Sequence, residues 1–118
     1  MIDTARESRP WGSFTVVDEG PNHKVKRIVV AAGKRLSYQR HAHRSEHWFV
    51  VQGHGIVTRN GLETRLDPGV AVDIPEGTAH RAHNTGTDDL VFVEVQRGDY
   101  LGEDDIVRLE DDFGRMSA

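Results

Sequence analysis

The chain has 118 residues, a formal net charge of -4 and no cysteine. A chain of this length forms one domain with one core, and without cysteine it has neither disulfides nor thiolate metal sites. The net negative charge argues against a nucleic-acid partner, because phosphate backbones select basic surfaces. No apolar run reaches membrane-spanning length, and the N-terminal residues lack the apolar core of a signal peptide. We therefore expect a cytoplasmic protein with a polar arm over residues 1–8, one domain over 9–115 and a short tail over 116–118.

Short runs rich in β-branched residues are separated by Gly, Pro and Asn along the chain. The predicted strands cover residues 13–17, 24–31, 36–43, 47–52, 55–59, 62–66, 70–74, 79–83 and 90–96. The pair Asn60-Gly61 predicts a hairpin turn, and Ile106 and Val107 form a candidate last strand in the acidic tail. No segment before residue 99 shows a helical period. This pattern predicts an all-β sandwich or closed barrel, and a jelly roll fits it.

Four side chains that can bind a metal lie in two blocks of the sequence. Gln39 and His41 are two residues apart, so on a β-strand both project from the same face. Glu46 follows after enough residues for a turn, and His80 follows a Pro-Glu-Gly turn in the second block. Nitrogen and oxygen donors that converge inside a barrel describe a site for a divalent transition metal. The alternative is that these four are ordinary polar residues in a β-sandwich.

Strand alternation nominates further residues of the site. Arg35 and Ser37 share the face of the first two ligands if their strand is regular, and Arg44 shares the face of Glu46. A carboxylate at Glu94 that faces the cavity could act as the general base, with its pKa set by burial and by the metal. Glu94 and Arg44 are therefore our catalytic candidates.

Two groups of motifs resemble known families. The intervals G-x5-Q-x-H-x4-E-x6-G from Gly33 and G-x5-P-x-G-x2-H-x3-N from Gly69 resemble the two-part cupin signature, with Gln39 where the first histidine usually stands. Further motifs resemble the type II phosphomannose isomerases, the C-terminal part of bifunctional mannose-1-phosphate guanylyltransferase/mannose-6-phosphate isomerases. These motifs are RPWGSF at 9–14, KVKRIVV at 24–30, HRSEHW at 43–48, IPEGTAHR at 74–81, EVQ at 94–96, YLGEDDIVR at 100–108 and FGR at 113–115.

The resemblance covers residues 9–115 and departs from the family at Ala42 and His83, where a histidine and an acidic residue usually stand. These two changes bear on the substrate pocket rather than on the metal site. The Gly-rich phosphate loop of the nucleotidyltransferase half is absent from the sequence, so we do not expect guanylyl transfer.

The resemblance implies an all-β, single-domain cupin jelly-roll β-barrel. It implies a metal-dependent isomerase that interconverts mannose 6-phosphate and fructose 6-phosphate by proton transfer through an enediol intermediate. The implied metal ligands are Gln39, His41, Glu46 and His80. Phosphomannose isomerases of this superfamily hold zinc in such a set, and Co²⁺, Mn²⁺ or Ni²⁺ suits the same donors. A small metal-binding cupin that acts as an iron dioxygenase, or that binds a sugar or metabolite without catalysis, is the alternative.

The substrate-binding candidates are Ser37, Arg35 and Arg115. Arg115 reaches a phosphate only if the tail folds back over the barrel mouth. We expect the acidic segment 103–105 to form a surface turn, and we expect Trp48 to lie in the core or in a dimer interface. Cupins of this size commonly pair and jelly rolls leave edge strands that need covering, so we expect a homodimer.

Two interpretations stay open for several basic residues. His43 and His47 lie close to the ligands in sequence, and we expect them behind the ligands or at the surface rather than on the metal. Lys24, Lys26 and Arg27 either hold a sugar phosphate or belong to a solvated strand face.

Overall fold

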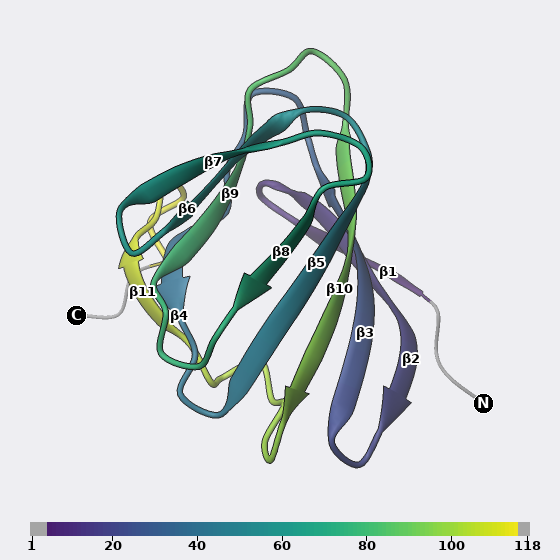
Figure 1. Ribbon diagram of the computed structural model, residues 1–118, viewed down its shortest axis with the longest axis vertical. Coiled ribbons are helices and arrows are strands. Elements are labelled where there is room, and N and C mark those ends of the chain that lie inside the picture. The colour runs from purple at the N-terminus through teal and green to yellow at the C-terminus, as the bar shows by residue number, and fades with distance from the viewer. Residues whose placement is uncertain (1–4, 116–118) are drawn as a thin grey trace.

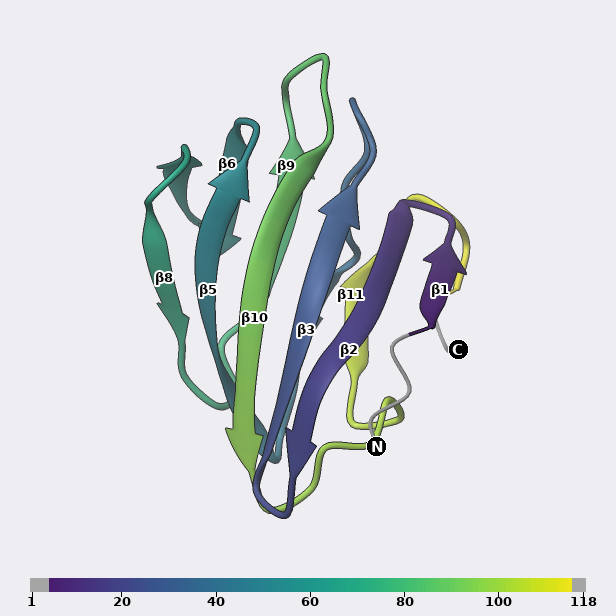
Figure 2. The same cartoon turned by 90° about the vertical axis from the view of Figure 1, so that its right-hand side faces the viewer.

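The computed structural model describes residues 5–115, which form eleven β-strands and no helix. The strands are β1 (Arg6–Arg9), β2 (Gly12–Gly20), β3 (His23–Val30), β4 (Tyr38–Arg40), β5 (Arg44–Gln52), β6 (Gly55–Arg59), β7 (Leu62–Leu66), β8 (Ala71–Ile74), β9 (His80–Asn84), β10 (Leu90–Gly98) and β11 (Val107–Glu110). They form two sheets with the strand orders β1-β2-β3-β10-β5-β8 and β11-β4-β9-β6-β7 (Figure 1). In Figure 2 the six-stranded sheet faces the viewer and the second sheet lies behind it. The predicted all-β jelly-roll barrel is confirmed.

The structure adds one strand before the predicted set and contains the candidate last strand. Part of the segment predicted as a polar arm forms β1, which pairs antiparallel with β2 and places Arg6 opposite Thr15. Its side chains are largely exposed, so no hydrophobic pattern marks this strand in the sequence. The candidate last strand is present as β11 and pairs with β4. Residues 1–4 of the arm and the predicted tail 116–118 lie outside the described residues.

The core fills the space between the two sheets. Trp48 on β5 and Phe92 on β10 stack with ring centroids 4.5 Å apart, and both are fully or almost fully buried. Val50 and Val30 continue the inward rows of β5 and β3 in the same layer. Burying a large apolar side chain contributes about 1.5–3 kcal/mol, so these alternating rows stabilise the sandwich and fix which residues point inward. Within residues 5–115 no helix has the length and hydropathy needed to cross a membrane.

Glycine is required at two positions of the barrel, one in a turn and one at the end of a strand. Asn60 and Gly61 both have positive φ, 46° and 84°, as a tight type I′ hairpin between β6 and β7 requires. This confirms the predicted hairpin. At Gly98 a Cβ atom would lie 2.0 Å from the carbonyl oxygen of His43. Glycine is therefore needed where the end of β10 pairs with the start of β5, next to the turn that carries His41.

Candidate metal centre

Neighbouring strands bring the candidate ligands into one pocket. Gln39 on β4 lies directly opposite His80 on β9, so the two side chains point to the same face of the second sheet. Glu46 comes from β5 of the six-stranded sheet, across the barrel from that face. His41 follows β4 in the turn to β5. All four side chains line one pocket between the sheets.

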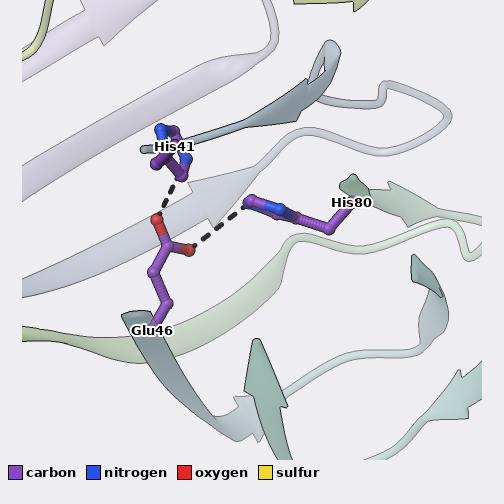
Figure 3. A group of neighbouring side chains, drawn as sticks. All are labelled: His41, Glu46 and His80. Carbon is purple, nitrogen blue, oxygen red and sulfur yellow. Dashed lines mark ion pairs between the residues drawn. The ribbon is translucent and has the colours of Figure 1, made fainter. Parts of the chain in front are cut away.

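The two imidazoles and the carboxylate form a close cluster (Figure 3). Nε2 of His41 is 3.1 Å from Oε2 of Glu46, and Nε2 of His80 is 3.6 Å from Oε1 of the same carboxylate. One donor atom from each of the three residues falls within 4.8 Å of the others. Each residue is at least 96% buried, since the exposures are 3%, 4% and 3% for His41, Glu46 and His80. Two nitrogens and an oxygen at this spacing suit a single transition-metal ion.

Hydrogen bonds to the backbone hold both histidines in the tautomer that a metal needs. Nδ1 of His41 lies 2.7 Å from the carbonyl oxygen of Asp105, and Nδ1 of His80 lies 2.8 Å from that of Thr78. A carbonyl only accepts, so Nδ1 donates in both rings and a neutral ring keeps its lone pair on Nε2. Both lone pairs face Glu46, and a cation between them removes the repulsion between lone pairs and carboxylate.

The charge states of the cluster favour a cation as well. Burial raises the pKa of Glu46, but its contacts with His41, His80 and Arg44 outweigh burial and hold this pKa well below its ordinary value. Burial is the main cause that lowers the pKa of His80, against the opposing charge of Glu46. An ionised carboxylate and a neutral imidazole are the ligand forms of these groups.

Gln39 is oriented so that its amide oxygen is the atom left for a ligand. Its Nε2 donates to the carbonyl oxygen of Ser37 at 3.2 Å and to the Ser37 hydroxyl at 3.0 Å. Ser37 is 1% exposed and lines the same pocket. The structure therefore gives this substrate candidate an additional task, which is to orient the amide of Gln39. With Oε1 as a fourth donor the set consists of oxygen and nitrogen atoms that suit Zn²⁺, Co²⁺, Mn²⁺ or Ni²⁺.

Both catalytic candidates are buried beside this cluster. Nη2 of Arg44 donates to Oε2 of Glu46 at 2.8 Å and lies 3.2 Å from Nε2 of His41. Glu94 lies opposite Trp48 on β5, is 4% exposed and lines the pocket. Burial, followed by the charge of Glu46, raises the pKa of Glu94 to about 8. A carboxyl group with this pKa exchanges its proton near neutral pH, as general acid–base chemistry requires.

Two positioning residues had no signal in the sequence. Nε1 of Trp48 donates to Oε1 of Glu46 at 2.9 Å, so this core tryptophan also orients the carboxylate. The carboxylate of Asp105 accepts the N–H groups of Ala42 and His43, both at 2.9 Å, and fixes the turn after β4. The predicted surface turn at 103–105 is therefore wrong for Asp105, which is 9% exposed. Its partners lie more than sixty positions away in the chain, at 62 and 63 residues, and no spacing rule connects them.

Arg35 lies outside the pocket, contrary to the prediction from strand parity. β4 begins only at Tyr38, and Arg35 belongs to an isolated bridge with His83, so regular alternation does not extend back to it. Its guanidinium binds Asp112 and Glu110 on the outside of the second sheet. His83, one of the two departures from the family, lies on this outer side as well, in a shallow depression that it shares with Arg35.

The remaining predicted basic residues divide between the surface and the pocket. Arg115 lines the pocket, so the segment that ends at Arg115 does fold back, but its guanidinium is bound to Asp111 at 2.9 and 3.0 Å. His43 and His47 are exposed and lie near aspartates, outside the metal cluster. Lys26 is 4% exposed and lines the pocket, so it does not belong to a solvated strand face, and its binding of a sugar phosphate stays a prediction.

A double-stranded antiparallel barrel with an internal His-Glu-His cluster and a neighbouring amide defines a cupin. A solved protein from Klebsiella pneumoniae described as having a double-stranded beta-helix domain superimposes with a TM-score of 0.77 and 25% identity, over 92% of each chain. The family model for the C-terminal domain of mannose-6-phosphate isomerase matches residues 3–111. The chain belongs to this family.

Relatives with similar sequence match this chain over only a small part of their own length. The xanthan biosynthesis protein XanB of Xanthomonas campestris pv. campestris is 50% identical over 107 residues, which are 91% of this chain and 23% of XanB. The mannose-1-phosphate guanylyltransferase ManC of Salmonella typhimurium is 46% identical over 108 residues, 92% of this chain and 22% of ManC. The chain thus spans less than a quarter of these relatives.

Proposed function

We propose that the protein is a metal-dependent isomerase that interconverts mannose 6-phosphate and fructose 6-phosphate. The observation that carries the proposal is one pocket that combines a buried His41-Glu46-His80 cluster with a protonatable buried carboxyl group at Glu94. Membership of the mannose-6-phosphate isomerase C-terminal family supports the choice of substrate.

The reaction moves a hydrogen between C2 and C1 of an open-chain sugar. A divalent cation held by His41, Glu46 and His80, with Gln39 as the fourth ligand, would polarise the carbonyl and hydroxyl oxygens as a Lewis acid. Glu94 in its ionised form takes the proton from C2 of the aldose, which leaves an enediolate. The hydroxyl proton passes from O2 to O1 through the enediol, and Glu94 returns its own proton to C1, which gives the ketose. Its pKa of about 8 makes both protonation states accessible near neutral pH.

The other pocket residues position these groups. Nη2 of Arg44 holds the Glu46 carboxylate at 2.8 Å, and its fixed positive charge in the pocket favours negative charge on the bound substrate. The hydrogen bond from Gln96 to the carboxyl group of Glu94 restrains the base. The pocket is also lined by Arg9, Lys26 and Arg115, so it offers cations to a phosphate group.

The direct test is turnover by the purified chain reconstituted with Zn²⁺ or Co²⁺. Mannose 6-phosphate should yield fructose 6-phosphate, and His80→Ala and Gln39→Ala should lose both bound metal and activity. His47→Ala is the matched control, because this histidine is exposed and lies outside the cluster. Oxygen consumption without isomerisation would indicate a dioxygenase, and tight sugar-phosphate binding without turnover would indicate a binding protein.

The expected homodimer and the cytoplasmic location stay predictions. Sedimentation equilibrium of the purified chain distinguishes a monomer from a dimer.

A further inference from the structure

Lys26 is a buried cation in the metal pocket that the metal cluster does not use. Its side chain extends from β3, and its Nζ lies 4.2 Å from the centroid of the Phe14 ring. The residue is 4% exposed. A buried ammonium group requires an anionic partner. That partner is Glu103, whose carboxylate accepts a hydrogen bond from Nζ.

Glu103 approaches the pocket from the solvent side. It lies in the segment between β10 and β11, which passes from one sheet to the other at the end of the barrel (Figure 2). Its second carboxylate oxygen is 4.0 Å from Nη1 of Arg44. The side chain of Glu103 is 51% exposed, whereas those of Lys26 and Arg44 are 6% and 7% exposed. A mobile anion from solution can therefore replace Glu103 without disturbing the buried cations.

A third basic residue of the same pocket has an unused hydrogen-bond donor. Arg108 on β11 lies opposite Gln39, and its Nε is buried without a hydrogen-bond partner among the described residues. Buried donors are normally satisfied, so this unpaired group is a second indication that the pocket accepts an additional anion.

We propose that Lys26 and Arg44 form the subsite for the phosphate group of the substrate, and that Glu103 occupies this subsite in the free protein. The choice of a sugar phosphate rests on the proposed function, whereas the subsite itself is defined by the charged groups of Lys26, Arg44 and Glu103. A phosphate offers the same acceptor oxygens as a carboxylate and carries more charge, so it replaces Glu103 and leaves both cations paired. Glu103 thus competes with substrate from within the chain.

The test is calorimetric titration of the metal-free protein with inorganic phosphate. Glu103→Gln keeps the size of the side chain and removes the competing charge, and we expect phosphate to bind about tenfold more tightly at low ionic strength. Asp104→Asn removes the same charge from the adjacent position, where the carboxylate accepts the Tyr100 hydroxyl instead of lining the pocket. This control should change the affinity by no more than about twofold.

Unchanged or weaker phosphate binding by Glu103→Gln overturns the subsite. Equal tightening by Asp104→Asn overturns it too, because the change in net charge alone would then explain the tighter binding.

Lys26→Met should weaken phosphate binding by about tenfold. If Lys26→Met does not fold, Lys26→Arg keeps the charge and should retain phosphate binding, and loss of binding in a folded Lys26→Arg protein counts against the subsite. The titration uses metal-free protein and inorganic phosphate, without sugar. Its result therefore does not depend on whether the chain isomerises sugars. An active isomerase whose Glu103→Gln variant binds phosphate no better refutes the subsite alone.

Discussion

Gln39 and His80 lie directly opposite each other on β4 and β9, so an amide and an imidazole enter the pocket side by side from two antiparallel strands. The amide nitrogen of Gln39 is committed to Ser37, and the ring Nδ1 of His80 is committed to the carbonyl of Thr78. Each side chain therefore presents one lone-pair atom, Oε1 and Nε2, to the same space. This pairing explains how an amide can replace the first histidine of the cupin signature.

Replacing Gln39 by Leu should weaken the binding of Zn²⁺ or Co²⁺ by at least about tenfold, because one of four donors is lost. The affinity is measured by competition with a chromophoric chelator. Arg40→Leu is the matched control, since Arg40 is exposed and points away from the pocket. Equal affinities of wild type and Gln39→Leu would show that the amide is not a ligand.

Replacing Asp105 by Ala should destabilise the fold by about 1–3 kcal/mol, because the N–H groups of Ala42 and His43 lose their charged acceptor. The same change should lower metal affinity, since this turn holds His41. Urea unfolding and metal titration measure the two effects. Asp104→Ala, in the same segment but without these partners, should leave both near wild type, and a similar loss in this variant would contradict the assigned role of Asp105.

Glu94 should make the stability of the metal-free protein depend on pH. Its folded-state pKa is raised from 4.5 to about 8, chiefly by burial, so the folded state binds this proton more tightly than the unfolded state does. The resulting stabilisation is fully present below 4.5 and is lost as the pH rises through about 8. Between pH 4.5 and about 8 the free energy of unfolding of the wild type should fall by a few kcal/mol, and Glu94→Gln should remove this decrease. Urea midpoints across this range measure it, and parallel curves for the two proteins would contradict the shifted pKa.

The clamp between Asp111 and Arg115 should persist into strong acid. The hydrogen bond from the Arg115 side chain is the largest cause that lowers the pKa of Asp111 from 3.8 to about 2. Its contribution to stability is therefore present above 3.8 and is lost only as the pH falls through about 2. Hydrogen exchange at the amide of Arg115, which donates to the same carboxylate, reports on the clamp. Asp111→Asn should exchange faster at neutral pH, and an unchanged rate would show that the clamp does not hold the tail.

The sequence is informative where a signal is local. Residue intervals nominated His41, Glu46 and His80, and the structure brings these three residues together. Each lies in or beside a short strand, where side chains alternate between two faces. Alternation on one regular strand also nominated Glu94 as a candidate that could face the cavity, and the structure buries it in the pocket. The same argument failed for Arg35, since β4 is only three residues long and the chain before it is irregular.

The contacts that the sequence did not predict join segments far apart in the chain. Asp105 supports His41 across 64 residues, and Glu103 reaches Lys26 across 77 residues. Such pairs depend on how the β10–β11 segment crosses the barrel end, which no local propensity encodes. The strand β1 escaped prediction for a different reason: its stabilisation comes from backbone pairing with β2, and its exposed side chains carry no apolar pattern.

The most direct test of the whole account measures isomerase activity against bound Co²⁺ in the purified chain. The account predicts that conversion of mannose 6-phosphate rises in proportion to bound metal up to one ion per chain and then stays constant. His80→Ala should bind no ion at this site and remain inactive. Activity that does not depend on bound metal, or a fully loaded protein that leaves mannose 6-phosphate unchanged, would contradict it.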